Sequence, residues 1–158
     1  ARIKIIDSNF YRGIDWPIVV MLAAMIPIGT ALQTTGVSSL IATLISQYAA
    51  DLSLFWILLI ILIVTMATTD IINNAATAVI MAPISTGIAI ELGYAIEPFL
   101  MVVAVGASCA FLTPIGHQCN TVVMGPGNYK FTDYWRMGLP MDILIILATI
   151  PMILFVWT

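Results

Sequence analysis

Charged residues are scarce in this chain of 158 residues. Only 8% of its residues are Asp, Glu, Lys or Arg, 61% are hydrophobic, and the mean hydropathy is +1.09. Such a chain has too little polar surface to cover a water-soluble globule of this length, so lipid must solvate much of it. Its five bases form no patch that could neutralise a phosphate backbone, which argues against nucleic acid as a partner.

The residues that build catalytic and metal sites are also few. Cys109 and Cys119 lack the spacing of a metal site and are too few for a disulfide framework, so we interpret both as packing residues. We find no Ser/His/Asp constellation, no pair of carboxylates in a cleft-like context and no glycine-rich phosphate loop. We therefore expect that the chain is not an enzyme.

Apolar runs of membrane-spanning length predict an all-α membrane protein. We expect a cytoplasmic lead-in over residues 1–13, a transmembrane helix over 14–36, and an amphipathic helix over 37–51 that lies at the membrane surface or against protein. At the other end we expect a cytoplasmic interfacial segment over 128–137 and a closing transmembrane helix over 138–158. In the amphipathic helix one face is predicted to carry Val37, Leu40, Ile41, Leu44, Ile45 and Tyr48.

A polar stretch divides residues 52–92 into two apolar segments, each at the lower length limit for a membrane span. The stretch reads Thr69-Asp70-Ile71-Ile72-Asn73-Asn74. A loop between two full spans normally carries solvated charge. This one has a single acid, Asp70, followed by two isoleucines and two asparagines. The pattern favours a re-entrant hairpin over 52–92 with its tip at 69–74.

A second interruption falls inside residues 98–127, which begin as an apolar helix. Proline, glycine and several polar side chains meet there, in the order Thr113-Pro114-Ile115-Gly116-His117-Gln118. This combination predicts a broken transmembrane helix with its break at 113–118.

The positions of the cations predict the topology. Arg2, Lys4 and Arg12 precede the first predicted span, and Lys130 and Arg136 precede the last. By the positive-inside rule both ends should be cytoplasmic, in a multi-pass protein of the inner (plasma) membrane. Both termini look like cuts through a longer protein, so we expect the chain to be a piece of one.

Paired breaks at membrane depth are typical of transporters. At each break one helix end offers carbonyl oxygens to a cation, and the next helix start offers N–H groups to an anion. Asn73 or Asn74 can cap the helix that follows, but both can equally serve only to tie helices together. Asp70 can bind a cation or titrate, or simply cap or pair, and His117 is more typical of a hydrogen-bonding loop residue than of a proton carrier.

Two motifs follow the pattern of a known family. The tip continues as Ala75-Ala76-Thr77-Ala78 and Met81-Ala82-Pro83-Ile84. The break is preceded by Ala107-Ser108-Cys109-Ala110-Phe111-Leu112 and followed by Asn120-Thr121-Val122-Val123, Gly125-Pro126-Gly127 and Arg136-Met137-Gly138-Leu139-Pro140. From about Asp15 onward the chain resembles the divalent anion/sodium symporters of the ion transporter superfamily, and in particular the carboxy-terminal repeat of a bacterial permease.

The resemblance implies the second of two inverted repeats, the amino-terminal one being a missing partner, in a homodimer that moves its transport domain across the lipid bilayer. It implies sodium-coupled symport of a small anion such as a dicarboxylate, citrate or sulfate. The anion would contact Asn73, Asn74, Ala75, Thr113, Pro114 and Asn120. Sodium would be held at Thr69, Ile72, Asn74 and Leu112.

The chain departs from the family pattern in two places. The usual Ser-Asn-Thr of the tip reads Asn73-Asn74-Ala75, and the loop before Asn120 is several residues longer. The Asn-Asn tip also resembles superfamily members that exchange sodium for protons or export arsenite, so an antiporter or an anion efflux carrier is the alternative within transport. A structural membrane subunit is the alternative of another class.

Overall fold

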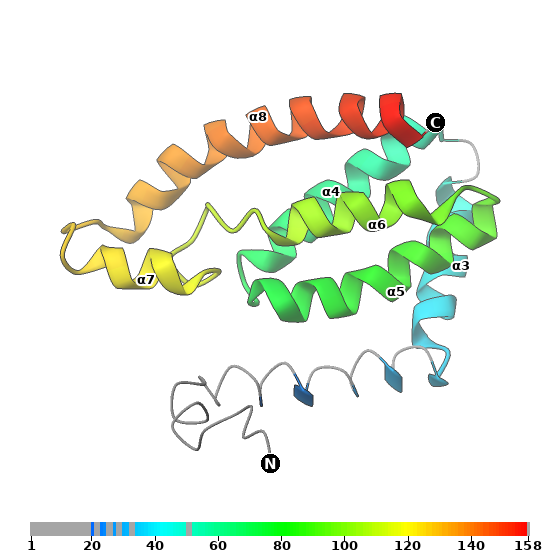
Figure 1. Ribbon diagram of the computed structural model, residues 1–158, viewed down its shortest axis with the longest axis horizontal. Coiled ribbons are helices and arrows are strands. Elements are labelled where there is room, and N and C mark those ends of the chain that lie inside the picture. Colours follow the sequence, from blue (N-terminus) through cyan, green and yellow to red (C-terminus); the bar gives the residue numbers. More distant parts are fainter. Residues whose placement is uncertain are drawn as a thin grey trace, which may run out of the picture.

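The computed structural model describes residues 34–49 and 52–157, together with isolated positions between 20 and 31. The predicted lead-in over 1–13 and most of the predicted transmembrane helix over 14–36 lie outside the described residues. The regular structure within the described part is helical (Figure 1). Its helices are α3 (Val37–Ala49), α4 (Leu54–Thr69), α5 (Asn74–Leu92), α6 (Ile96–Ala107), α7 (Gln118–Met124) and α8 (Phe131–Trp157).

A helical hairpin is formed by α4 and α5, which the turn at 70–73 joins. The 16 residues of α4 measure about 24 Å and the 19 residues of α5 about 28 Å, against about 30 Å of hydrocarbon in a bilayer. Of the two, only α5 is long and apolar enough to be a candidate span; α8 is the other such helix among the described residues. The turn falls where the tip was predicted. That it stops inside the bilayer stays a prediction.

The core lies where α6 packs against both arms of the hairpin and α8 covers α4 and α6. Gly106 of α6 lets the backbones approach, because a Cβ there would lie 3.0 Å from the Thr65 Cβ of α4. Small residues commonly allow such close approach between helices in membranes. Large apolar side chains buried in this core include Leu58, Leu62, Ile88, Phe99, Val102, Ile150 and Ile153.

Helix α3 packs on α5, but not through the apolar face that its periodicity predicts. Ala42 is fully buried and Ser38 nearly so, whereas Leu40 and Leu44 are exposed. The reason is again close approach, since a Cβ on Gly87 of α5 would lie 2.9 Å from the Ala42 Cβ. Large side chains on the packed face would hold the two helices apart. The apolar face of α3 is therefore open to lipid or to another protein surface.

The break in the predicted helix over 98–127 is present, but it begins at Ser108 rather than at Thr113, and α7 starts at Gln118. Ser108 Oγ donates to the Ala104 carbonyl at 2.9 Å, and Cys109 Sγ lies 3.1 Å from the Val105 carbonyl. Side-chain hydrogen bonds of this kind compete with the helical backbone pattern. The ten residues 108–117 are accordingly free to turn toward other partners.

Helix α8 begins at Phe131 and runs across the boundary between the last two predicted segments, 128–137 and 138–158. The carboxylate of Asp133 accepts from the Lys130 N–H at 2.8 Å, which caps the helix start from within its first turn. Pro140 and Pro151 lie inside α8 without ending it. The aromatic and cationic residues of 131–137 are thus an extension of the predicted closing span.

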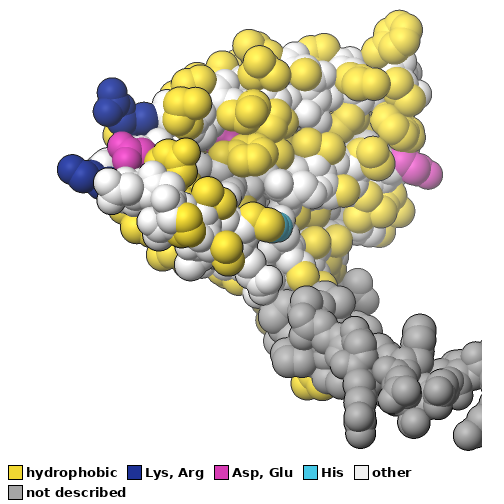
Figure 2. Space-filling view, turned by 60° about the vertical axis from the view of Figure 1, so that its left-hand side comes forward, with side chains coloured by type: hydrophobic (Ala, Val, Ile, Leu, Met, Phe, Trp, Pro, Cys, Tyr) yellow, Lys and Arg dark blue, Asp and Glu magenta, His cyan; other side chains and the backbone are white. Residues whose placement is uncertain are grey.

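The surface of the described part is largely apolar. Leu147, Met152 and Phe155 of α8 are 69%, 67% and 90% exposed. Figure 2 shows hydrophobic side chains spread over one face of the described part, with Lys and Arg beside an acid at one end and another acid at the opposite end. Contiguous apolar surface of this extent requires lipid or protein to cover it.

Candidate ion and anion site

The hairpin tip and the helix break, 38 or more residues apart in sequence, meet in space (Figure 1). Thr69 Oγ1 lies 2.9 Å from the Ala107 carbonyl at the end of α6. The Leu112 N–H donates to Asp70 Oδ1 at 3.0 Å, and the Thr113 hydroxyl donates to the Asp70 carbonyl at 2.6 Å. Predicted residues from both motifs are therefore neighbours. Together these contacts define the junction between tip and break.

A glycine closes the junction. A Cβ on Gly116 would lie 2.7 Å from the Thr69 carbonyl and 3.1 Å from the Asp70 Cα. Both of these are backbone atoms, which cannot give way as a flexible side chain can. Gly116 is required here by the close approach of two backbones. From the sequence, Gly116 is expected only to break a helix, because the residues around it do not indicate its contact with Thr69 and Asp70.

Asn74 joins the junction through Thr69. The Thr69 hydroxyl lies 2.9 Å from both Asn74 Oδ1 and the Ala107 carbonyl, yet it has a single hydrogen to donate. Turning the Asn74 amide by 180° places its nitrogen toward Thr69, and the two contacts are then satisfied together. An amide orientation is assigned from such networks. In that orientation the carbonyl oxygen of Asn74 is available to a cation.

Asn73 caps α5, which is one of the roles that the sequence predicts for the asparagines of the tip. Its Oδ1 accepts from the Ala76 N–H at 2.8 Å. This leaves the N–H groups of Asn74 and Ala75, which as the first residues of a helix have no acceptor in a preceding turn. Asn73 is exposed, and Asn74 and Ala75 are half-buried. The start of α5 can therefore donate to an anion.

The other predicted anion contacts are engaged in holding the break. Asn120 Nδ2 donates to the carbonyls of Ala110 at 2.8 Å and Thr113 at 3.1 Å. The Thr113 hydroxyl, already donating to Asp70, also accepts from the Ile115 and Gly116 N–H groups. The Pro114 carbonyl accepts from the Thr121 hydroxyl at 2.6 Å. In this arrangement Thr113, Pro114 and Asn120 make hydrogen bonds that fix the conformation of the loop. A contact between these residues and an anion stays a prediction.

His117 takes the structural one of its two predicted roles. It is the N-cap of α7, and its Nδ1 accepts from the Cys119 N–H at 3.2 Å. The interpretation as a hydrogen-bonding loop residue is confirmed. The position of His117 between Gly116 and Gln118, at the end of the break, is what indicates this role in the sequence.

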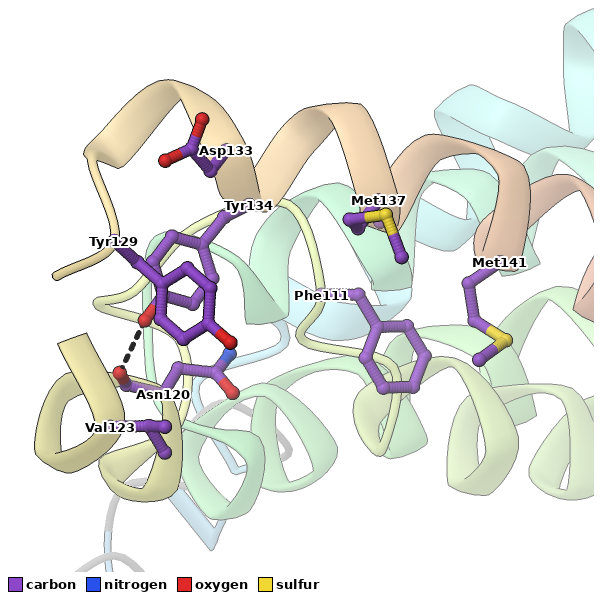
Figure 3. Close-up of a pocket in the computed structure, with 9 residues that line it drawn as sticks. Phe111, Asn120, Val123, Tyr129, Asp133, Tyr134, Met137 and Met141 are labelled. Carbon is purple, nitrogen blue, oxygen red and sulfur yellow. Dashed lines mark hydrogen bonds between the residues drawn. The ribbon is translucent and has the colours of Figure 1, made fainter. Parts of the chain in front are cut away.

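Helix α8 supports the break from outside. The Tyr134 hydroxyl donates to the Asn120 carbonyl at 2.6 Å, and Figure 3 shows Tyr129 and Tyr134 beside Asn120. A cavity of about 500 Å³ opens there between α7 and α8. Its lining is mostly apolar and includes an acid, so it offers little to a multivalent anion. The lining residues are Phe111, Asn120, Val123, Tyr129, Asp133, Tyr134, Met137, Gly138 and Met141.

Three buried polar atoms in the described part have no hydrogen-bond partner. They are Asp70 Oδ2, Thr77 Oγ1 and Asp142 Oδ1. No group of three or more His, Cys, Asp or Glu side chains with metal-binding geometry occurs among the residues that the structure describes. The oxygen-rich junction instead suits a hard cation, which prefers carbonyl, amide and carboxylate oxygen.

Comparison with known proteins defines the class: the relatives of this chain are transporters. An uncharacterized transporter of Synechocystis sp. is 37% identical over 95% of this chain and 24% of the relative. A second, from Escherichia coli, is 35% identical over 97% of this chain and 25% of the relative. Sodium/sulfate cotransporter 2 of Chlamydomonas reinhardtii is 28% identical over 87% of this chain and 16% of the relative.

The family follows from a match to a family model. The sequence model of the citrate transporter family matches residues 4–106, and the chain belongs to this family. The expected relationship to anion transporters is thereby confirmed. The chain spans about a quarter of the length of the two bacterial relatives.

Proposed function

We propose that this chain is one part of a secondary active transporter that carries a small di- or trivalent anion, such as a dicarboxylate, citrate or sulfate, together with sodium ions. The observation that carries the proposal is the junction itself. Thr69 and Asp70 contact Ala107, Leu112 and Thr113 of the break, and Thr69 also contacts Asn74, so that the ends of α4 and α6 meet the start of α5. Two distant relatives that are named as sodium/sulfate cotransporters support the same substrate class.

Sodium binds, in this proposal, at the carboxyl ends of α4 and α6. These helices end at Thr69 and Ala107, so the negative ends of two helix dipoles converge on the junction. Unwound backbone carbonyls and half-helix ends coordinate sodium in other transporters with discontinuous helices. The carbonyls of Thr69, Ile72 and Leu112 and the amide oxygen of Asn74 are the proposed ligands.

The anion binds at the start of α5, beside the cation. The free N–H groups of Asn74 and Ala75 and the amides of Asn73 and Asn74 supply donors without a fixed positive charge. Bound sodium next to them adds the missing charge, and this couples the two ligands electrostatically. Thr113, Pro114 and Asn120 hold the opposite wall of the site.

This half-site needs a counterpart. The chain is proposed to be the second of two inverted repeats, with the first repeat supplying the other half of the anion site. The isolated chain is then expected not to transport. The short length of α4 supports a hairpin that enters and leaves the plasma membrane from one side, and the exposed Lys130 and Arg136 mark the proposed cytoplasmic end.

Uptake into liposomes tests the proposal. The full-length protein is reconstituted, and uptake of radiolabelled sulfate, succinate or citrate is measured with a sodium or a potassium gradient. At least one of these anions should enter only with sodium. Asn74→Ala should lower uptake by about tenfold or more, because it removes an amide contact to both ligands.

Gln47→Ala on α3 is the matched control, since it deletes an exposed amide outside the junction. It should leave uptake unchanged. Proton flux with no anion requirement, or anion uptake that is equal in sodium and potassium, would contradict sodium symport.

A further inference from the structure

Helix α8 carries a carboxylate in its apolar interior. Asp142 is only 8% exposed, and its Oδ1 has no hydrogen-bond partner in the described part of the chain. Asp70 at the hairpin tip shares these properties, with 4% exposure and an unpartnered Oδ2. An ionisable side chain within a membrane helix is costly and commonly marks an ion pathway.

The two carboxylates flank the same stretch of the break. Asp70 Oδ1 accepts from the Leu112 N–H, which places Asp70 on one side of this stretch. Gly138 of α8 packs against the same stretch, where a Cβ would lie 2.5 Å from the Phe111 carbonyl and 3.1 Å from the Leu112 nitrogen. Asp142 follows Gly138 by four residues and so lies on the same face of α8.

Electrostatics place the two acids in one neighbourhood. The charge of Asp70 acts on Asp142, and the charges of both act on Cys109, which is 4% exposed. Cys109 begins the stretch 109–112 that Asp70 and α8 enclose. Two buried acids whose charges both act on one buried thiol lie in the same region of the protein.

Carboxylates that stay ionised there need a charge of the opposite sign, because otherwise each would bind a proton. The basic side chains of the described part are Lys130 and Arg136, and both are exposed near the start of α8. Two buried like charges repel strongly where the dielectric is low, and desolvation adds several kcal/mol for each ion. A hard monovalent cation held between carboxylate oxygens offsets both costs.

We propose that Asp70 and Asp142 form a carboxylate pair that binds a sodium ion between the hairpin tip and α8. The inference rests on the proposed function, because it deepens the sodium coupling of the same transporter. It adds two side-chain ligands to the carbonyl and amide oxygens of the junction. It also assigns a role in sodium binding to α8.

Sodium binding to the full-length purified protein tests the pair, with no anion present. Equilibrium binding of radioactive sodium is measured for the wild type, Asp142→Asn, Asp70→Asn and Glu91→Gln. Each variant removes one carboxylate charge at nearly constant size, and Glu91 is exposed at the end of α5. Asp142→Asn and Asp70→Asn should each weaken sodium binding by about tenfold or more, or remove one sodium per chain, while Glu91→Gln behaves as wild type.

Melting temperature supplies a second readout. Sodium should raise the Tm of the wild type over that in potassium, because a ligand that binds only the folded state stabilises it. Asp142→Asn should reduce this rise. If Asp142→Asn does not yield folded protein, Asp142→Glu is measured in its place. That variant keeps the charge but moves it by one methylene, so it should keep a sodium-induced rise with weaker sodium affinity.

The outcomes separate the two proposals. Sodium-dependent anion uptake together with wild-type sodium binding by Asp142→Asn overturns the carboxylate pair alone. Anion uptake without any sodium requirement overturns the proposed function. Uptake of a proton in place of sodium at the pair, seen with a pH-sensitive dye, also overturns the pair.

Discussion

The two breaks in the helical structure are built in different ways. The hairpin tip is a turn of four residues, 70–73, that its own sequence closes: Asn73 caps the helix that follows. The break at 108–117 is longer, and side chains from elsewhere hold it, namely Thr69 and Asp70 of the tip and Asn120 of α7. The conformation of the tip thus depends on neighbouring residues in the sequence. The conformation of the break, in contrast, depends on contacts with the tip.

Gly116→Ala is expected to disrupt the contact between tip and break more than any other substitution considered. The new Cβ would meet the Thr69 carbonyl at 2.7 Å, so tip and break must separate. Overpacking of this kind costs about 1–3 kcal/mol, and sodium-dependent uptake should be lost with the junction. Tm in detergent and liposome uptake are the measurements.

Gly125→Ala is the matched control, because a Cβ there meets nothing within 4 Å. It should leave both quantities near the wild-type values. Equal Tm and uptake for the two alanine variants would contradict the close approach at Gly116.

Thr113→Val tests the break side of the junction. The change removes the hydroxyl that donates to the Asp70 carbonyl and accepts from the Ile115 and Gly116 N–H groups. Groups left without partners should lower stability by about 1–3 kcal/mol. Thr68→Val, whose hydroxyl donates within its own helix to Val64, should cost less. A smaller loss of Tm for Thr113→Val than for Thr68→Val would speak against the junction.

Asn73 variants sharpen the comparison on the tip side. Asn73→Ala should cost about 1 kcal/mol, the usual effect of losing an N-cap. Asn73→Ser keeps a capping oxygen but loses the amide donors, so it should keep the stability and weaken anion binding. Chemical denaturation and anion binding measured on the same samples separate the two effects. Parallel losses in both variants would show that Asn73 serves only as a cap.

Tyr134→Phe is expected to have the smallest effect. It removes the hydrogen bond to the Asn120 carbonyl, worth about 0.5–1.5 kcal/mol, and leaves the tip untouched. Tm should fall slightly while the sodium dependence of uptake persists. Tyr94→Phe, on the far turn before α6, serves as the control for loss of a hydroxyl. A complete loss of transport in Tyr134→Phe would show that contacts with α8, rather than contacts with the tip, determine the conformation of the break.

The same contrast explains how much the sequence could predict. The tip at 69–74 and the cap at Asn73 depend on neighbouring residues, and the structure has its turn at 70–73. The sequence predicts a break from Thr113, whereas the break begins at Ser108, and its course through Leu112 and Thr113 depends on Asp70, which lies about 40 residues earlier. Local pattern carries no information on such distant partners.

Packing contacts were the other features beyond the reach of the sequence. The roles of Gly116 and Gly138 follow from backbones that approach only in the folded chain. Likewise, α3 packs through Ser38 and Ala42, which lie beside the face that its periodicity favours. Asp142 looked like one more scattered acid, because its burial depends on helices on both sides of it. The family resemblance, carried by the two motifs, located the region of the site but not these contacts.

Hydrogen–deuterium exchange of the full-length protein tests most directly whether the junction holds sodium. Exchange is compared in sodium and in potassium for peptides that cover 66–78 and 106–120, with a peptide over 144–157 of α8 as the internal reference. Sodium should slow exchange in the first two peptides together and leave the reference unchanged. Identical exchange of the tip and break peptides in the two salts would contradict a sodium site at the junction.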